Sequence, residues 1–294
     1  MTETVLTASE TERPTTATEE AMSTSRRKGR AQRGSTRRAA LRGWRLALAQ
    51  LGVLVAWLAV WQLVVSRGWT PSVLAVYPSE VFSFLKTSYQ SGELVEATVA
   101  TMYATLIAFV LASFVGVVVG ISLGLMPRTE RVLQPYLDAL NSMPRIALAP
   151  VFIIAFGITT TAKVALAFTI VVFILMSNAR AGIRSADPDV MRLSTVLGAS
   201  KLQLFFKVML PVAVPSIFAG LRIGLIYSLL GVVTAEIIAS KIGLGQLIMK
   251  YSGLYQLEGV FGILLVLAVI GALLNMLMSA LERWILRYQP PADH

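Results

Sequence analysis

The chain has 294 residues, of which 55% are apolar and only 14% charged, and its mean hydropathy is +0.69. This composition excludes a soluble globular domain of that length and indicates a membrane protein. Cysteine is absent and the single histidine is His294, which excludes disulfides, thiol catalysis, cysteine- or histidine-ligated metals and a histidine-based triad. We therefore expect no catalytic residue, no metal and no cofactor.

The first 43 residues are rich in Thr, Ser, Glu and Arg and poor in large apolar residues. They predict a disordered cytoplasmic tail over 1–43, ahead of a transmembrane domain over 44–294. Basic residues crowd the junction: Arg26, Arg27, Lys28, Arg30, Arg33, Arg37, Arg38, Arg42 and Arg45. This cluster is of a kind that can bind nucleic acid, but it adjoins an apolar run and follows no nucleic-acid-binding fold. We interpret it as a topology signal that also contacts anionic lipid headgroups, with no nucleic-acid partner.

Six apolar segments predict an all-α, polytopic membrane protein with about six transmembrane helices. Their approximate bounds are 46–65, 97–125, 133–158, 162–177, 214–238 and 260–281. After the first segment, Pro78-Ser79-Glu80 predicts the start of a short interfacial helix that ends near Tyr89. In the second, Gly116, Gly120 and Gly124 recur every four residues, which predicts close approach of another helix.

The third segment is interrupted by Pro135, Pro144, Pro150 and Gly157. An ordinary proline kink is one interpretation. The other is a broken span that lines a pathway, because irregular backbone at membrane depth is tolerated where it is buried in protein or faces a cavity.

Basic residues are distributed unevenly between the two sides of the expected membrane. With the N-terminus inside, 20 of the 26 Lys and Arg residues fall on cytoplasmic segments, Arg128, Arg131 and Arg145 of the second loop among them, and five fall outside. Lys163 is one of those five. The imbalance predicts that both termini, and the loop over 182–211, are cytoplasmic.

Two ionisable residues, Arg222 and Glu236, lie within the fifth segment, where a charge is costly and marks function. They are about 21 Å apart along a helix, too far to pair with each other. Arg222 either extends to the headgroups or serves as a gate or anion site. Glu236 either caps the turn at 241–245 or pairs with Lys241, or else it contacts a partner or an outer gate. Gly243-x-Gly245 is too weak a signal for a nucleotide site, so any ATP would be bound by another subunit.

The 182–211 loop carries its own helix signals. Asp187 is a helix cap and Pro188 suits the first helical position. Val190, Leu193 and Leu197 then form a short apolar stripe, which ends at Gly198. Apolar residues continue beyond it at Leu202, Phe205, Phe206 and Met209. Two short helices joined at a Gly-Ala-Ser turn would form an element that docks into a groove of a partner.

This loop resembles the EAA loop of bacterial ABC-type importer permeases, in which a Gly lies six residues after the Glu of the motif and a Leu-Pro pair follows. Gly198 and Leu210-Pro211 have this spacing, whereas the Glu-Ala-Ala of the family is here Arg192-Leu193-Ser194. The resemblance extends from Trp44 to Tyr288. Its further segments are 141–150, 156–157, 217–222, 235–236 and 243–245, and they are similar to the subgroup for nitrate, aliphatic sulfonates, taurine and some heteroaromatic vitamin precursors.

The resemblance implies a MetI-like type I importer permease fold and a non-catalytic permease subunit of the bacterial inner membrane. It implies as partners two ATPase subunits, which hydrolyse the ATP, a second permease copy and an extracytoplasmic solute-binding protein. The residues implied to dock an ATPase are Arg192, Leu193, Ser194, Gly198, Ala199, Ser200, Leu210 and Pro211. Those implied to form the substrate pathway or a gate are Met143, Pro144, Arg222 and Glu236. Because Arg192 reverses the usual charge, the resemblance predicts the shape of this loop better than it predicts the ion pairs of the loop with an ATPase.

The function implied is import of a small solute, an anion such as nitrate, sulfonate or taurine, with a heteroaromatic vitamin precursor as the alternative. An ion-coupled secondary transporter is the alternative from another class. The sequence has no inverted pair of interrupted spans and few ionisable residues at membrane depth, which disfavours that alternative. A membrane scaffold without transport would not need a broken helix.

Overall fold

The computed structural model describes residues 48–50, 52–53, 55–68 and 76–286. The chain divides into two compact units, Met1–Trp69 and Thr70–His294, which are described separately. In the first unit, the helix Leu48–Ser66 is long and apolar enough to cross a membrane. The disordered tail expected over 1–43 lies outside the described residues.

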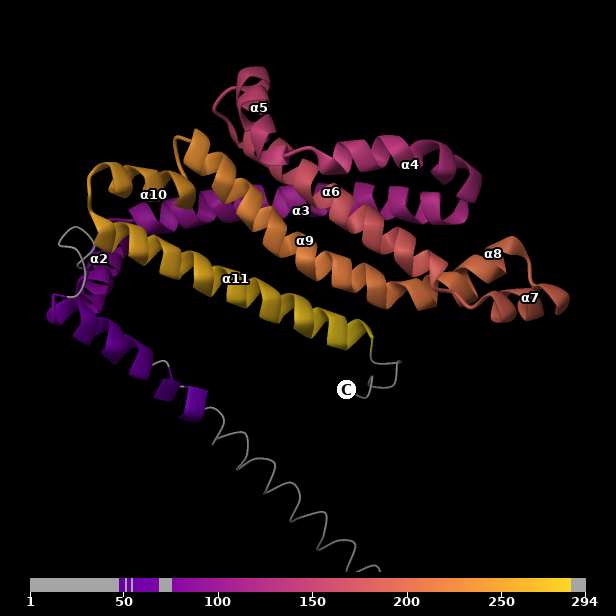
Figure 1. Cartoon of the computed structure of the whole chain (residues 1–294), viewed down its shortest axis with the longest axis horizontal. Helices are drawn as coiled ribbons and strands as arrows, with labels where there is room; N and C mark the ends of the chain where they lie inside the picture. The colour runs from indigo at the N-terminus through magenta and orange to yellow at the C-terminus, as the bar shows by residue number, and fades with distance from the viewer. Residues whose placement is uncertain (1–47, 51, 54, 69–75, 287–294) are drawn as a thin grey trace, which may run out of the picture. The chain divides into compact units, whose positions relative to one another are not determined.

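The described part of the second unit is helical and contains no strand. Its elements in chain order are α2 Pro78–Gln90, α3 Glu93–Leu125, α4 Pro127–Ser142, the 3-10 helix η2 Arg145–Leu148, α5 Ala149–Phe156, α6 Thr160–Arg184, α7 Pro188–Val196, α8 Lys201–Leu204, the π-helical turn η3 Phe205–Met209, α9 Leu210–Ile238, α10 Leu244–Gly253 and α11 Leu257–Ile285 (Figure 1). The described residues contain five candidate spans, or six if the bent pair of α4 with η2–α5 counts as one. The all-α class and the number of spans are therefore confirmed.

The core of the second unit forms where α6 packs between α3 and α9 (Figure 1). The three glycines of α3 provide this contact: a Cβ on Gly116 would lie 2.7 Å from the carbonyl oxygen of Val172, and one on Gly124 would lie 2.9 Å from Ile183. Glycine is needed there because the helix backbones approach more closely than any side chain allows. The close approach predicted for these residues is confirmed.

The third span is broken at Met143 and Pro144, which leave the helical conformation with ψ of 135° and 91°. The helices on either side are bent by 80°. The steric clash of a proline with the preceding residue disfavours the α conformation at Met143, which accounts for the position of the break. The expected interruption at Pro135 is wrong, since Pro135 lies inside α4 without ending it.

The 182–211 loop folds partly as expected. α7 begins at Pro188, and the Asp187 carboxylate caps it by accepting a hydrogen bond from the Asp189 N–H at 2.8 Å. The expected second short helix is not separate, because residues 201–238 form one continuous helical segment. The π-helical turn directly precedes Pro211, whose missing N–H would otherwise interrupt the helix, and this turn allows the helix to continue.

Candidate functional site

The 182–211 loop presents an exposed apolar surface. α7 and α8 lie at one end of α6 and α9, and α10 lies at the other end (Figure 1). Five apolar side chains on α7, its C-terminal turn and the segment from α8 onward are more than half exposed: Leu193, Val196, Leu197, Leu202 and Phe206. We call these five residues the docking surface. Exposed apolar surface of this kind marks a site of contact with another molecule.

Four of the residues expected to dock a partner are exposed: Arg192, Leu193, Gly198 and Ser200. Ser194 and Ala199 are half-buried beside them, whereas Leu210 and Pro211 lie further along, in the first turn of α9. Arg192 pairs with Asp189 at 3.4 Å, and both side chains are at least 80% exposed, so this ion pair contributes little stability. The Arg192 charge is therefore accessible to a partner.

Gly198 forms the turn after α7 with a φ of +82°, and a Cβ there would meet no atom within 4 Å. Glycine is required by the backbone conformation alone, because L side chains penalise positive φ by about 1–2 kcal/mol. The structure thus agrees with the sequence on why glycine stands at this turn.

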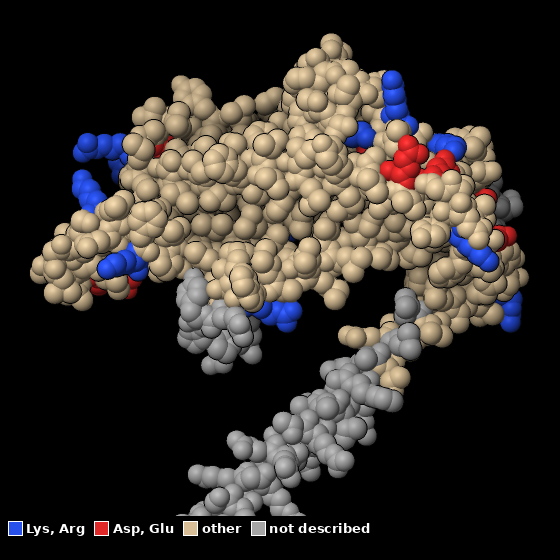
Figure 2. Space-filling model, turned by 180° about the vertical axis from the view of Figure 1, so that it is seen from behind, with Lys and Arg blue, Asp and Glu red and all other residues tan. Residues whose placement is uncertain are grey.

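Charged residues on the second unit occur mainly near the two ends of its long helices, and most of the surface between them carries neither charge (Figure 2). The charges that do lie within the helices are therefore informative. Among the described residues, five ion pairs join such helices to a neighbour, whereas a sixth cation, Arg145, has no carboxylate partner.

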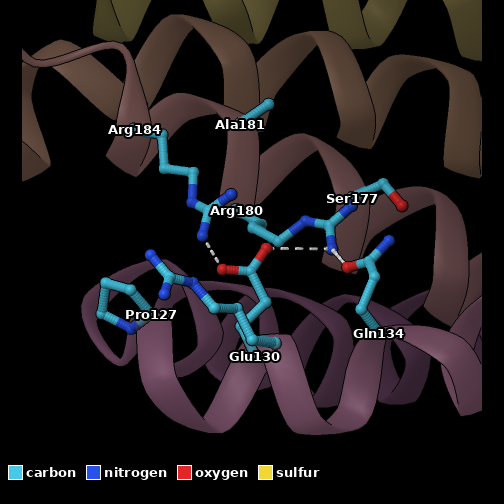
Figure 3. Close-up of a pocket in the computed structure, with 8 residues that line it drawn as sticks. Pro127, Glu130, Gln134, Ser177, Arg180, Ala181 and Arg184 are labelled. Atoms are coloured by element: carbon cyan, nitrogen blue, oxygen red, sulfur yellow. Dashed lines mark hydrogen bonds and ion pairs between the residues drawn. The ribbon is translucent and has the colours of Figure 1, made fainter.

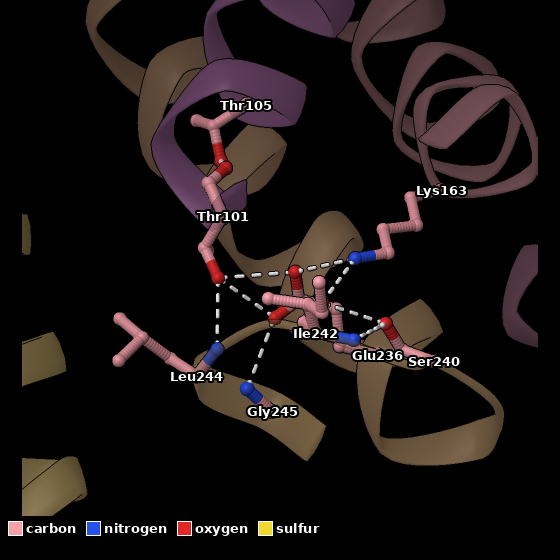
Figure 4. Close-up of polar contacts among 8 residues, drawn as sticks. All are labelled: Thr101, Thr105, Lys163, Glu236, Ser240, Ile242, Leu244 and Gly245. Atoms are coloured by element: carbon pink, nitrogen blue, oxygen red, sulfur yellow. Dashed lines mark hydrogen bonds and ion pairs between the residues drawn. The ribbon is translucent and has the colours of Figure 1, made fainter. Parts of the chain in front are cut away.

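The first of these ion pairs is buried at the end of the unit that carries α10. The Glu236 side chain, on α9, is fully buried, and its Oε1 accepts hydrogen bonds from Lys163 Nζ of α6 and from Thr101 Oγ1 of α3, each at 3.0 Å (Figure 4). The expected pairing with Lys241 is wrong. Lys163 lies in the first turn of α6, which begins at Thr160.

The same carboxylate holds the turn between α9 and α10 (Figure 4). Glu236 Oε2 accepts a hydrogen bond from the Gly245 N–H at 3.0 Å, and Thr101 Oγ1 accepts one from the Leu244 N–H at 2.9 Å. A Cβ at Gly243 would overlap the Glu236 carboxylate, so this turn must contain glycine there. Glu236 of α9 therefore contacts α3, α6 and the start of α10. It caps the turn, which is what one of the two interpretations of the sequence predicted.

The same end of the unit carries a second link between α3 and α10. Glu93 accepts hydrogen bonds from Lys250 Nζ and from the Tyr251 hydroxyl, each at 2.5 Å. Burial raises the pKa of Tyr251 to about 12, and its hydrogen bond to Glu93 adds to that rise. Tyr251 is therefore protonated, and able to donate this bond, at any physiological pH.

Arg222, expected in a gate or an anion site, forms an ion pair with Glu282 of α11, 60 residues away in the sequence. Its charge is thus balanced within the chain.

At the same end of the unit, Glu130 of α4 pairs with Arg180 and Arg184 of α6 beside a cavity of about 570 Å³ (Figure 3). Arg180 also donates to Gln134 Oε1 at 2.6 Å. These contacts join α4 to α6.

A further cavity, of about 410 Å³, lies at the break of the third span. We call it the break pocket. Its lining includes Met143, from the expected pathway pair, and Arg145. Arg145 does not lie in a cytoplasmic loop as expected, because its guanidinium donates to the Ile170 carbonyl oxygen of α6 at 3.4 Å. The guanidinium carbon also lies 4.5 Å from the centre of the Phe173 ring.

The sequence interpretation did not find Thr101, Lys163 or Arg145 as site residues. The sequence signal for these residues was weak. Lys163 and Arg145 each lie at the edge of an apolar run, where a charged residue usually indicates a loop. A threonine in an apolar helix, such as Thr101, carries no signal at all.

Residues 112–287 match the family of binding-protein-dependent transport system inner membrane components. The chain belongs to this family. It is therefore the membrane component of such a transport system, and a multi-pass membrane protein. The expected family is confirmed.

Curated relatives agree with this assignment. The chain is 31% identical over 247 residues to the putative aliphatic sulfonates transport permease protein SsuC of Bacillus subtilis (strain 168), covering 84% of this chain and 88% of that one. It is 30% identical to the taurine transport system permease protein TauC of Escherichia coli (strain K12), covering 82% and 91%. It is 31% identical to the bicarbonate transport system permease protein CmpB of Synechococcus elongatus (strain ATCC 33912 / PCC 7942 / FACHB-805), covering 87% and 97%.

Solved structures support the fold alone. An inward-facing structure of the MetNI methionine ABC transporter matches with a TM-score of 0.54 and 19% identity, covering 63% of this chain and 94% of that chain. The expected MetI-like permease fold is confirmed.

We predict that Glu236→Gln lowers the melting temperature of the purified full-length chain, because it leaves Lys163 buried without an anion. Breaking a buried ion pair costs about 3–5 kcal/mol. The double variant Glu236→Gln/Lys163→Met is expected to recover much of that loss. Lys250→Met, which breaks the partly exposed pair with Glu93, is the control and should shift the melting temperature less. Equal losses in the single and the double variant would contradict an ionic role for Glu236.

Proposed function

We propose that this chain is the transmembrane subunit of an ATP-driven ABC importer, and that it passes a small anion, of the class of nitrate, sulfonate and taurine, across the bacterial inner membrane. The observation that carries the proposal is the docking surface. Its five exposed apolar side chains lie on α7, its C-terminal turn and the first residues of the helical segment Lys201–Ile238, at the end of the unit that we propose to be cytoplasmic, so a protein partner is the natural occupant.

The proposed partner on this surface is an ABC ATPase subunit. Two copies of the chain would form the pore, and each would receive one ATPase on α7 and the Gly198 turn. An extracytoplasmic solute-binding protein would deliver the solute at the opposite end, beside α10. Arg192 extends from the docking surface, so an acidic or neutral groove on the ATPase fits it better than a basic one, since like charges across an interface are unfavourable.

The continuous helix Lys201–Ile238 supports a mechanism of coupling. It starts at the docking surface, passes Arg222 and the break pocket, and ends at Glu236. A movement of α7 driven by ATP is therefore transmitted along one rigid element to both ends of the pathway. We propose that the Arg222–Glu282 pair is part of an inner gate and the Glu236–Lys163 pair part of an outer gate. Rearrangement of such contacts converts inward-open and outward-open states.

We predict that Gly198→Val abolishes co-purification of the ATPase while membrane insertion stays normal, because a β-branched residue disfavours the φ of +82° and displaces α7. Gly92→Val is a matched control, because Gly92 has a φ of +81° and a Cβ there would also meet no atom within 4 Å. Gly92 lies directly before α3, at the end of the unit away from the docking surface (Figure 1). The Gly92→Val variant should retain the ATPase. Affinity purification from the native host followed by an ATPase assay measures both variants. Retention of the ATPase by Gly198→Val would contradict the proposed docking site.

The proposed orientation, with both termini in the cytoplasm, has its own test. The chain contains no cysteine, so single-cysteine variants react without background. Leu197→Cys, on the docking surface, should react with a membrane-impermeant maleimide only in inside-out vesicles stripped of peripheral subunits. Tyr255→Cys, whose native side chain is 82% exposed at the far end, should react only in right-side-out vesicles. The reverse pattern would invert the topology.

A further inference from the structure

We propose that the break pocket is the anion-recognition site of the transport pathway, with Arg145 as its recognition residue, and that its ligand is an organic oxyanion with a short apolar tail, such as an alkanesulfonate. This inference rests on the proposed importer function and names its substrate class. The residues that carry the argument are Asn141, Arg145, Ile146, Tyr227, Leu230 and Thr234, all of which line the cavity.

The first observation is the depth of Arg145. Its guanidinium contacts the carbonyl oxygen of Ile170, which lies ten residues from the outer end of α6 at Thr160. At 1.5 Å per residue this is about 15 Å, which is half of the roughly 30 Å thickness of the hydrocarbon core. A charge at this depth is expensive and is found where it faces an aqueous path or a ligand.

The second observation is the balance of charge. Lys163 and Arg180 of α6 and Arg222 of α9 each have a carboxylate partner. Within the described part of the chain, no carboxylate lies within ion-pair distance of Arg145, and its Nε is buried without a hydrogen-bond partner. Its positive charge is therefore available to an anion.

The third observation is that polar side chains gather at this cavity. Asn141 and Arg145 come from the two sides of the broken span, and Tyr227 and Thr234 come from α9. Tyr227 is 46% exposed in the single chain. Lipid chains offer no hydrogen-bond partners to polar side chains, so the cavity faces the protein-lined path of the assembled pore.

The chemistry of the lining selects the ligand. A guanidinium binds an oxyanion in bidentate fashion, and the Tyr227 hydroxyl and the Asn141 amide supply further donors. Ile146 and Leu230, both more than half exposed at the cavity, provide contact for an apolar tail. The volume of about 410 Å³ lies within the usual range for sites that bind small organic molecules, roughly 300–1,000 Å³.

The lining also disfavours two other solutes. It contains no Asp or Glu, so the ammonium group of a zwitterion such as taurine has no ionic partner. Bicarbonate has no apolar part, so the apolar side chains contribute nothing to its binding. Of the solutes in the names of the three relatives, the aliphatic sulfonate fits best.

A purely structural role for Arg145 makes a different prediction. Its Nη2 donates to the backbone oxygen of Asn141 at 3.4 Å and to its side-chain oxygen, and a cation there stabilises the C-terminal end of α4. Lysine would preserve that stabilisation but not a bidentate contact. Arg145→Lys therefore separates the two roles.

The test uses the full-length chain, purified from its native host with the subunits that accompany it, and measures binding of butane-1-sulfonate, taurine and bicarbonate by calorimetry. We expect butane-1-sulfonate to bind at least tenfold more tightly than the other two. Arg145→Met should weaken its binding at least tenfold. Arg145→Lys should also weaken it, with no loss of melting temperature. Arg283→Lys, the same substitution at an exposed arginine of α11 that does not line the break pocket, is the matched control and should bind like the native chain.

Equal binding of butane-1-sulfonate to the native chain and to Arg145→Met would overturn the site, and tighter binding of taurine or bicarbonate would overturn the substrate class. Co-purifying ATPase activity is measured in the same preparations. Its absence from the native preparation would refute the importer function, whatever the anion result. Its presence in every variant, together with unchanged anion binding, would refute only the Arg145 site.

Discussion

A charge within a membrane-spanning helix needs a partner, and this constraint organises the second unit of the chain. The hydrocarbon interior offers no water, so an unpaired ion there is costly. Glu236 meets this requirement with Lys163, Thr101 and the backbone of the α9–α10 turn, and Arg222 meets it with Glu282. These pairs tie α9 to α6 near its C-terminal end and to α11 near its middle. Arg145 is the exception, and it lies where the third span is broken.

The long helix from Lys201 to Ile238 relates the sites to one another. The exposed docking surface lies at its start, the break pocket beside residues 227–234 and the buried carboxylate of Glu236 near its end. Close contact with α6 through Gly220, Gly224 and Gly231 makes its position sensitive to small shifts, because packed interfaces tend to have discrete arrangements. A partner bound at one end can thus influence contacts at the other without any catalytic group in this chain.

Sequence patterns predicted the features that depend on local chemistry. The helices, the break before Pro144, the glycine stripe of α3 and the capped start of α7 all follow from residues close together in the chain. The ion pairs did not follow, since Lys163 lies 73 residues from Glu236, and Arg222 lies 60 residues from Glu282. Which helices face each other decides such pairs, and periodicity does not contain that information. Arg145 was misplaced for a related reason: a proline break suggests the end of a span, whereas here the chain bends by 80° at the break and continues in α5.

The central claim is that the broken span lines an aqueous path, and the absence of cysteine allows a direct measurement of it. In the assembled complex, Met143→Cys places one thiol at the break pocket, and Phe114→Cys places one on α3, where the native side chain is 73% exposed and apolar. The reagent is 2-sulfonatoethyl methanethiosulfonate, a water-soluble organic sulfonate. The account predicts rapid modification of Met143→Cys, slowed by butane-1-sulfonate, and little modification of Phe114→Cys. A Met143→Cys thiol as unreactive as that of Phe114→Cys would contradict it.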